Sequence, residues 1–262
     1  MTDQAQTQPL TPELFAQGFM TPRRASVPKE LVLPGGTLAQ LATSEGDVAV
    51  QVAGTGPAVL LLHGWEGQAS DMAAFVPPLL AAGLSVVAVH LPAHGASAGR
   101  QSSIPQAARA LRDVGARLGP WQGAIAHSVG CAVLVEALHA GLVVRRVVAL
   151  AAPARYEHHV RGAAAALGLD ADDTERALGL LTAAMGADVR AVSLPGRAPT
   201  RHEPALFMHS EDDRVVPIGE SLLSAGAWPG AVHRRLGGLG HRRLLGDADV
   251  VAAAVDFVRR AT

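Results

Sequence analysis

Short apolar runs alternate with longer amphipathic stretches through most of the chain. The runs are rich in Val, Ala and Leu and have the length of buried strands; they cover residues 37–42, 48–52, 58–62, 85–90, 122–126, 145–150 and 204–209. The stretches in which apolar residues recur at helical spacing cover residues 72–82, 104–118, 131–140 and 247–260. This alternation predicts an α/β fold with a mostly parallel central sheet and helices on both of its faces.

Two regions depart from this pattern. Residues 153–200 show no strand signal and contain two helical stretches, so we predict a helical cap inserted into a core formed by residues 31–152 and 201–262. Residues 1–30 are rich in Gln, Thr and Pro and predict a loosely held N-terminal arm with one short helix near residues 13–18. We expect the functional part of the chain to begin after this arm.

Composition narrows the class of protein. A chain of 262 residues with 49% hydrophobic content suits one globular domain plus a cap, and 3% aromatic content predicts a core of Ala, Leu and Val. The net charge of −1 gives no reason to expect a nucleic acid or an anionic membrane as partner. Cys131 is the only cysteine, which excludes an intrachain disulfide. We find neither a secretory signal nor an apolar stretch long enough to span a membrane, so the expected location is cytoplasmic. The sequence leaves the oligomeric state open.

The segment Ala126-His127-Ser128-Val129-Gly130 lies between a predicted strand and a predicted helix. Such a sharp turn strains the backbone of its apex residue and leaves room only for small residues two positions to either side, a demand that Ala126 and Gly130 meet. The segment resembles the nucleophile elbow of the α/β-hydrolase superfamily, with Ala126 where glycine is commoner. The resemblance implies that Ser128 is the nucleophile, whereas the motif alone would also suit a loop serine.

Further segments of the chain resemble other motifs of the same superfamily. His63-Gly64-Trp65 follows the strand 58–62 where the superfamily has its oxyanion loop, which implies that the N–H groups of Trp65 and Val129 bind a tetrahedral oxyanion. We expect His63 to shape this loop rather than to catalyse. Glu66 suits a pocket mouth and a plain surface position equally well.

The segment 90–97 resembles the superfamily's Asp-x-Pro-Gly-His-Gly-x-Ser turn, but with His90 at the acidic position and Ala93 at the first glycine. No acidic role is therefore carried over to it, and we expect His94 to be structural.

The acid and the base lie late in the chain. The segment 204–217 resembles the superfamily's strand and acid loop, and alignment on its Val-Pro ending makes Asp213 the acid, with Asp212 as the rival one residue away. Gly237-Gly238-Leu239-Gly240-His241 matches the loop that carries the catalytic histidine before the last helix. The order Ser128, Asp213, His241 is the one expected for this fold.

The resemblance therefore implies a serine hydrolase that forms an acyl-enzyme, and we expect a carboxylic-ester hydrolase for small or medium acyl substrates. Thioesterase, lipase, peptidase, acyltransferase or perhydrolase activity would use the same triad, and a non-catalytic ligand-binding module is a further alternative. A serine nucleophile argues against haloalkane dehalogenases and epoxide hydrolases, which attack through an aspartate. No cofactor or metal is expected, since the histidines lack paired ligands at convincing spacing. Tyr156, His158 and Met185 of the cap stay outside the predicted site.

Overall fold

The computed structural model describes residues 10–24, 33 and 35–260. Within this part of the chain, one sheet of eight strands has the order β1-β2-β4-β3-β5-β6-β7-β8. The strands are β1 (Thr37–Thr43), β2 (Gly46–Ala53), β3 (Ala58–Leu62), β4 (Ser85–Val89), β5 (Trp121–His127), β6 (Val147–Leu150), β7 (Ala205–Ser210) and β8 (Val232–Leu236). Strand β2 is antiparallel to both β1 and β4, and all pairs from β4 to β8 are parallel. The predicted fold class, α/β with a mostly parallel sheet, is confirmed.

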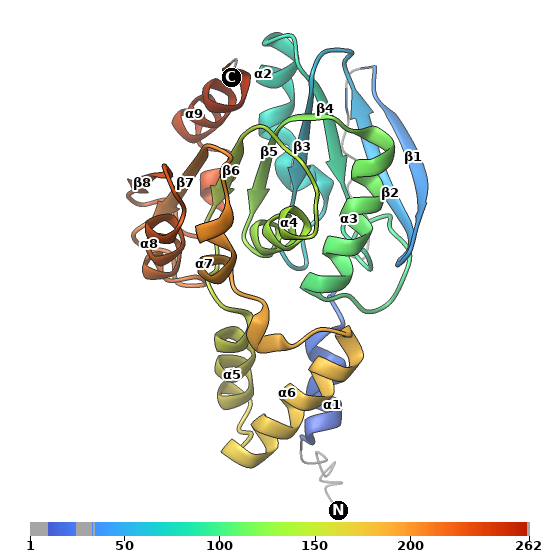
Figure 1. Cartoon of the computed structure of the whole chain (residues 1–262), viewed down its shortest axis with the longest axis vertical. Coiled ribbons are helices and arrows are strands. Elements are labelled where there is room, and N and C mark those ends of the chain that lie inside the picture. The colour runs from blue at the N-terminus through green and yellow to red at the C-terminus, as the bar shows by residue number, and fades with distance from the viewer. Residues whose placement is uncertain (1–9, 25–32, 34, 261–262) are drawn as a thin grey trace, which may run out of the picture.

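Helices cover both faces of the sheet, as Figure 1 shows. The α-helices are α1 (Pro12–Phe19), α2 (Val76–Ala81), α3 (Ile104–Leu118), α4 (Val129–His139), α5 (Tyr156–Ala166), α6 (Ala171–Met185), α7 (Leu194–Arg197), α8 (Ile218–Ala227) and α9 (Ala248–Arg259); short 3-10 helices are at Ala69–Phe75, Val189–Ala191, Ala198–Thr200 and Arg243–Leu245. Alternate residues along the strands pack into two separate hydrophobic cores. Leu60 and Leu62 belong to the core that includes α3 and α4, whereas Val59 and Leu61 belong to the core that includes α2 and α9.

The inserted region and the N-terminal arm lie together beyond one end of the sheet. Figure 1 shows α5 and α6 below the core, with α1 beside α6. The side chain of Phe15 in α1 is buried, and the rings of Phe19 and Tyr156 lie 5.7 Å apart. Arg24 donates hydrogen bonds to three carbonyl groups of the loop 93–99. The arm is therefore packed rather than loosely held over residues 10–24; its other residues lie outside the described part of the chain.

The sequence did not predict the short helix α7, the helix α8 or the strand β8. The residues of β8 are partly or fully exposed, and three of its five are His or Arg. A strand at the edge of a sheet has fewer neighbours to bury it, so it needs no apolar run. In addition, the predicted helix 72–82 divides into a 3-10 turn followed by the short α2.

Candidate active site

Ser128 occupies the turn between β5 and α4 with φ 52° and ψ −125°, a strained conformation for a residue with a side chain. The turn is tight because α4 packs directly against β3. A Cβ atom on Gly130 would lie 2.5 Å from the carbonyl oxygen of His63 and 3.0 Å from that of Leu62. A Cβ atom on Gly64 would lie 3.0 Å from the Cβ of Ser128. The glycines thus let the turn approach the loop after β3 closely.

This packing leads to a stability prediction. We expect Gly130→Ala to lower the free energy of unfolding by about 1–3 kcal/mol, because the new methyl group would meet backbone atoms that cannot rotate away. The control is Gly162→Ala in α5, where nothing lies within 4 Å of the new Cβ; there the free energy of unfolding should rise by about 0.5–1 kcal/mol. Urea denaturation measures both. A Gly130→Ala protein as stable as wild type would contradict the packing described.

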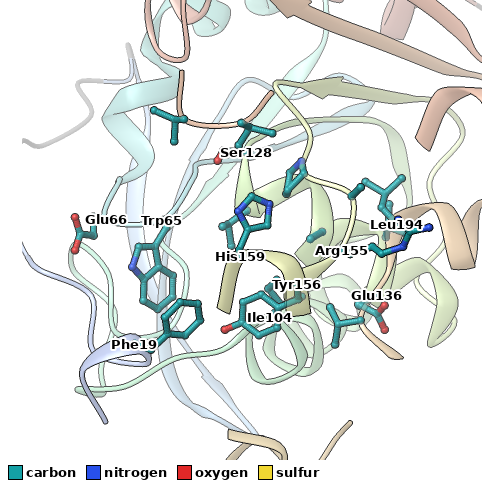
Figure 2. Close-up of a pocket in the computed structure, with 18 of the residues that line it drawn as sticks. Phe19, Trp65, Glu66, Ile104, Ser128, Glu136, Arg155, Tyr156, His159 and Leu194 are labelled. Atoms are coloured by element: carbon teal, nitrogen blue, oxygen red, sulfur yellow. The ribbon is translucent and has the colours of Figure 1, made fainter. Parts of the chain in front are cut away.

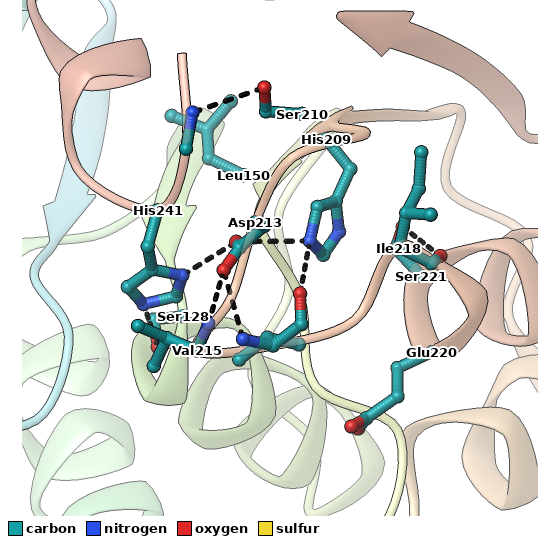
Figure 3. Close-up of polar contacts among 12 residues, drawn as sticks. Ser128, Leu150, His209, Ser210, Asp213, Val215, Ile218, Glu220, Ser221 and His241 are labelled. Carbon is teal, nitrogen blue, oxygen red and sulfur yellow. Dashed lines mark hydrogen bonds and ion pairs between the residues drawn. The ribbon is translucent and has the colours of Figure 1, made fainter. Parts of the chain in front are cut away.

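Ser128, His241 and Asp213 form one hydrogen-bonded chain, although they come from three distant segments. The Oγ of Ser128 lies 3.0 Å from Nε2 of His241, and Nδ1 of His241 lies 2.7 Å from Oδ2 of Asp213 (Figure 3). His241 lies in the loop after β8, and His127 donates from its Nε2 to the backbone carbonyl of His241 at 2.8 Å. A carbonyl oxygen can only accept, so this contact assigns the proton of His127 to Nε2.

Asp213 is held by several donors. Its Oδ1 accepts from the N–H groups of Val215 and Val216 at 2.8 and 3.0 Å, and its Oδ2 accepts from Nε2 of the buried His209 at 3.1 Å as well as from His241. Burial raises the pKa of Asp213, but the two N–H groups and His241 outweigh this effect and hold the pKa below its ordinary value. The carboxylate is therefore ionised at neutral pH and acts as an acceptor toward Nδ1 of His241.

The side chain of Asp212, the alternative acid considered from the sequence, contacts other residues than His241. It bonds the Ser210 hydroxyl and accepts from the N–H of Gly240 at 3.0 Å, and it pairs with Arg243 at 3.6 Å. No contact joins Asp212 to His241 within the described residues. The register of the acid loop thus brings Asp213, not Asp212, to the histidine.

The two residues implied by the sequence as backbone donors line one cavity together with Ser128. Val129 is the first residue of α4, so its N–H has no carbonyl partner within its own helix and lies at the positive end of the helix dipole. Trp65 lies in the loop after β3 and lines the same cavity as Ser128 and Val129. That these two N–H groups bind an oxyanion stays a prediction.

His63 is buried and holds this loop in place. Its Nε2 accepts from the N–H of Leu91 at 3.0 Å, which leaves the proton on Nδ1, and Nδ1 donates to the carbonyl of Gly64 at 2.7 Å. Burial lowers the pKa of His63 well below its ordinary value, so the ring is neutral. With both nitrogens engaged, His63 has the structural role expected of it. His94 likewise donates to the Pro92 carbonyl at 2.9 Å within its own turn.

Ser128 borders two cavities. The larger has a volume of about 330 Å³ and is lined mainly by apolar side chains, including those of Phe19 in α1, Val135 in α4 and Val215 in the acid loop (Figure 2). The smaller, of about 190 Å³, is lined by His241, His127 and Asp71 among others. The nucleophile therefore lies between an apolar cavity under the cap and a polar cavity beside the histidine.

Several residues of the larger cavity were not predicted. Phe19 of the N-terminal helix lines it, as do Arg155 and His159. Of the three cap residues left outside the predicted site, Tyr156 lines the cavity, whereas Met185 is buried in the core and His158 is exposed outside the cavity lining. The sequence offers no local signal for Phe19, because its place in the wall depends on contacts with α5, far along the chain.

Glu66 also lines this cavity and has a left-handed backbone with φ 56°. Its carboxylate lies 3.4 Å from the guanidinium of Arg23. Glu66 thus belongs to the mouth of the pocket, one of the two positions the sequence allowed.

The described part of the chain has neither a cluster of metal-binding side chains nor a helix that could cross a membrane. No group of three or more His, Cys, Asp or Glu side chains there is arranged to hold a metal ion. Among the described helices, none is both apolar enough and long enough to cross a membrane.

The fold and this site define an α/β hydrolase. Residues 59–254 match the model of the Alpha/beta hydrolase family, and the chain belongs to that family. No curated protein matches the sequence closely enough to be reported as a relative.

Solved structures share the fold at low sequence identity. An esterase from Pyrococcus furiosus superposes with a TM-score of 0.71 at 16% identity, covering 92% of this chain and 97% of that one. A bromoperoxidase from Bacillus anthracis gives 0.65 at 16% identity, covering 86% and 100%. An esterase from a Rhodococcus species gives 0.61 at 20% identity, covering 84% and 98%. At these identities the likeness concerns the fold alone.

Proposed function

We propose that this protein is a serine hydrolase that cleaves carboxylic esters of small or medium acyl groups through an acyl-enzyme. The observation that carries the proposal is the hydrogen-bonded chain from Asp213 through His241 to Ser128, which ends at the wall of an apolar cavity. A serine hydroxyl is a weak nucleophile, and a histidine oriented by a carboxylate is the group that activates it.

The reaction follows from these positions. Nε2 of His241 accepts the Ser128 proton while Oγ bonds to the ester carbonyl carbon, and the N–H groups of Trp65 and Val129 bind the resulting oxyanion. As the carbon–oxygen bond to the alcohol breaks, the His241 imidazolium returns its proton to the leaving oxygen. A water molecule then repeats the sequence on the acyl-enzyme and releases the acid. Asp213 stabilises the imidazolium throughout without being protonated.

The two cavities suggest how a substrate is oriented. The alcohol must leave next to His241, which lines the smaller, polar cavity. The acyl group would then occupy the larger cavity, whose apolar lining suits a hydrocarbon chain. We therefore propose a small-molecule ester as the partner of this site, with neither a nucleic acid nor a cofactor in the reaction.

The decisive experiment is labelling with a fluorophosphonate, which forms a stable bond only with an activated serine. We expect one label per chain, on the peptide that contains Ser128, and no label on Ser128→Ala. An acyl-chain series of p-nitrophenyl esters, with matched thioesters and amides, should show hydrolysis of esters and identify the preferred leaving group. Absence of both labelling and hydrolysis of every substrate would refute the proposal and favour a non-catalytic, ligand-binding role.

A further inference from the structure

Two histidines share the carboxylate of Asp213. Its Oδ2 lies 2.7 Å from Nδ1 of His241 and 3.1 Å from Nε2 of His209, which belongs to strand β7. Figure 3 shows the two rings on opposite sides of the carboxylate. His209 is not among the described residues that line either cavity, so it would act on a substrate only through its neighbours.

The contacts of His209 fix its tautomer. Its Nε2 lies 2.9 Å from the carbonyl oxygen of Val216, and a carbonyl oxygen can only accept, so the proton is on Nε2. The same N–H group is shared with Oδ2 of Asp213. Nδ1 is then an acceptor, and this buried atom has no hydrogen-bond partner among the described residues. The ring is therefore held through Nε2 alone.

His209 completes the set of donors around the Asp213 carboxylate. An ionised carboxylate offers about four lone-pair sites. Oδ1 accepts from the N–H groups of Val215 and Val216, and Oδ2 accepts from His241 and His209. The side chain of Asp213 is 0% exposed, so bulk water does not reach it. Each of the four sites therefore depends on a donor from the protein.

His209 also joins the carboxylate to the backbone of its own loop. Val216 donates its N–H to Oδ1 of Asp213 at 3.0 Å, and its carbonyl accepts from Nε2 of His209 at 2.9 Å. The same Nε2 lies 3.1 Å from Oδ2, so the peptide of Val216, the ring and the carboxylate form a closed set of contacts. Without the ring, one side of the carboxylate would lose its anchor.

The N–H group of His209 weakens the field that Asp213 exerts on His241. A carboxylate beside an imidazole favours the protonated form of the ring. An N–H dipole on the same oxygen points its positive end at the carboxylate and offsets part of that attraction. A general base has to be unprotonated before it can accept the serine proton. The donors on Oδ2 therefore affect the pH range in which His241 can act as the base.

The groups that face His209 leave its ring neutral. Burial is the main cause that lowers the pKa of His209 below its ordinary value, and it also lowers the pKa of His233, which lies near His209 on strand β8. Helix α8 presents the uncharged Ser221, whose Oγ lies 2.9 Å from Nε2 of His233. His209 is thus a neutral donor to Asp213 at neutral pH rather than a second positive charge.

The other groups near His241 keep their charge at neutral and alkaline pH. Burial and His241 itself lower the pKa of His127 to about 3, so this ring is neutral there. Arg242, which also acts on His127, stays positively charged. A change in the pH dependence of the site after substitution of His209 would therefore arise through Asp213.

We propose that His209 is a positioning residue of this site: its Nε2–H group orients the Asp213 carboxylate, weakens the attraction of that carboxylate for protonated His241, and so extends ester hydrolysis to lower pH. The inference rests on the proposed esterase function. It gives a buried ring that lines neither cavity a part in setting the pH range of the reaction.

The test is the pH profile of kcat/KM for one p-nitrophenyl ester, compared between wild type and His209→Leu. In the variant Oδ2 has one donor fewer, so Asp213 holds the His241 proton more strongly. The midpoint of the acid side of the profile should therefore rise by about 0.5–1 pH unit, the equivalent of one hydrogen bond. At the plateau, kcat should fall about tenfold because the carboxylate is less well oriented, while KM stays as in wild type.

Further variants separate hydrogen bonding from packing. His209→Gln should return the midpoint to the wild-type value, because its amide N–H group reaches about as far as Nε2 and can donate to the same oxygen. His209→Asn, whose shorter amide does not reach Oδ2, should behave like His209→Leu and replaces it if that variant does not fold. His233→Leu is the matched control, since Nε2 of His233 contacts Ser221 rather than Asp213; it should leave the midpoint unchanged.

Two measurements guard against partial unfolding. Titration with a fluorophosphonate counts the active sites of each variant, so that kcat is expressed per active site. Each sample is also returned to pH 7.5 after exposure to acid, and full recovery of activity shows that the acid side of the profile reflects protonation rather than loss of structure.

The outcomes distinguish the two proposals. If the midpoint of His209→Leu equals that of wild type or lies below it, the role given to His209 is wrong and the esterase function stands. The same conclusion follows if His233→Leu moves the midpoint as far, or if His209→Gln behaves like His209→Leu. If wild type hydrolyses no ester and takes up no fluorophosphonate label, the esterase function itself fails, and the inference fails with it.

Discussion

Asp213→Asn should lower kcat/KM for ester hydrolysis by about 10⁴-fold, the loss known for the same change in a Ser-His-Asp protease. The amide of an asparagine offers an N–H where His241 needs an acceptor, so the imidazole would adopt the wrong tautomer and lose its proton-accepting Nε2. The structure makes this result specific, because Oδ2 of Asp213 is the atom 2.7 Å from Nδ1 of His241.

Asp212→Asn is the matched control, since it makes the same chemical change one residue away. Asp212 contacts Ser210, Gly240 and Arg243 rather than His241, so we expect kcat/KM to change by no more than about threefold, as for other substitutions near the surface. Steady-state kinetics on one p-nitrophenyl ester, with circular dichroism of each variant, measure the difference. A large loss in Asp212→Asn with little loss in Asp213→Asn would show that the acid loop has the other register.

The site could be predicted from the sequence where its residues lie in local motifs. Ser128 is recognisable because a strand-to-helix turn restricts its neighbours to small residues, and His241 because a glycine-rich loop precedes the last helix. The choice between Asp212 and Asp213 depended on alignment alone. The structure distinguishes them because only one of two adjacent side chains in the loop after β7 can face the histidine.

What the sequence could not predict depends on contacts between distant segments. Phe19 lies in a segment that looks like a polar arm, and it lines the cavity only because α1 packs beside α6 and its ring reaches Tyr156. The strand β8 lacks an apolar run because it lies at the edge of the sheet, where few neighbours bury it.

A second large effect is expected in acid: the free energy of unfolding should fall steeply between about pH 6.5 and pH 4. Burial lowers the pKa of His90 from the ordinary value of 6.5 to about 4, with a further lowering by His94. Burial and the neighbouring His241 lower the pKa of His127 to about 3. Both rings are neutral in the folded protein, whereas they take up a proton near pH 6.5 in the unfolded chain.

The sign of this pH dependence follows from the difference in proton uptake between the folded and the unfolded protein. Over this interval the unfolded chain binds more protons than the folded protein, so stability is greatest above pH 6.5 and is lost as the pH falls toward the folded-state pKa values. Each such histidine contributes a slope of about 1.4 kcal/mol per pH unit, so these two should lower the free energy of unfolding by several kcal/mol by pH 4. That is comparable to the whole stability of a typical domain, which is about 5–15 kcal/mol.

Urea denaturation at pH 7, 6, 5 and 4 measures the slope. His90→Asn should reduce the slope of the free energy of unfolding against pH by about 1.4 kcal/mol per pH unit, which corresponds to one proton. The reason is that the variant no longer has this buried ring, which takes up a proton when the wild-type chain unfolds. His202→Asn is the control: this histidine is exposed, so removing it should leave the slope as in wild type. Equal slopes for wild type and His90→Asn would mean that the ring of His90 is already protonated in the folded protein, contrary to its burial near the ring of His63.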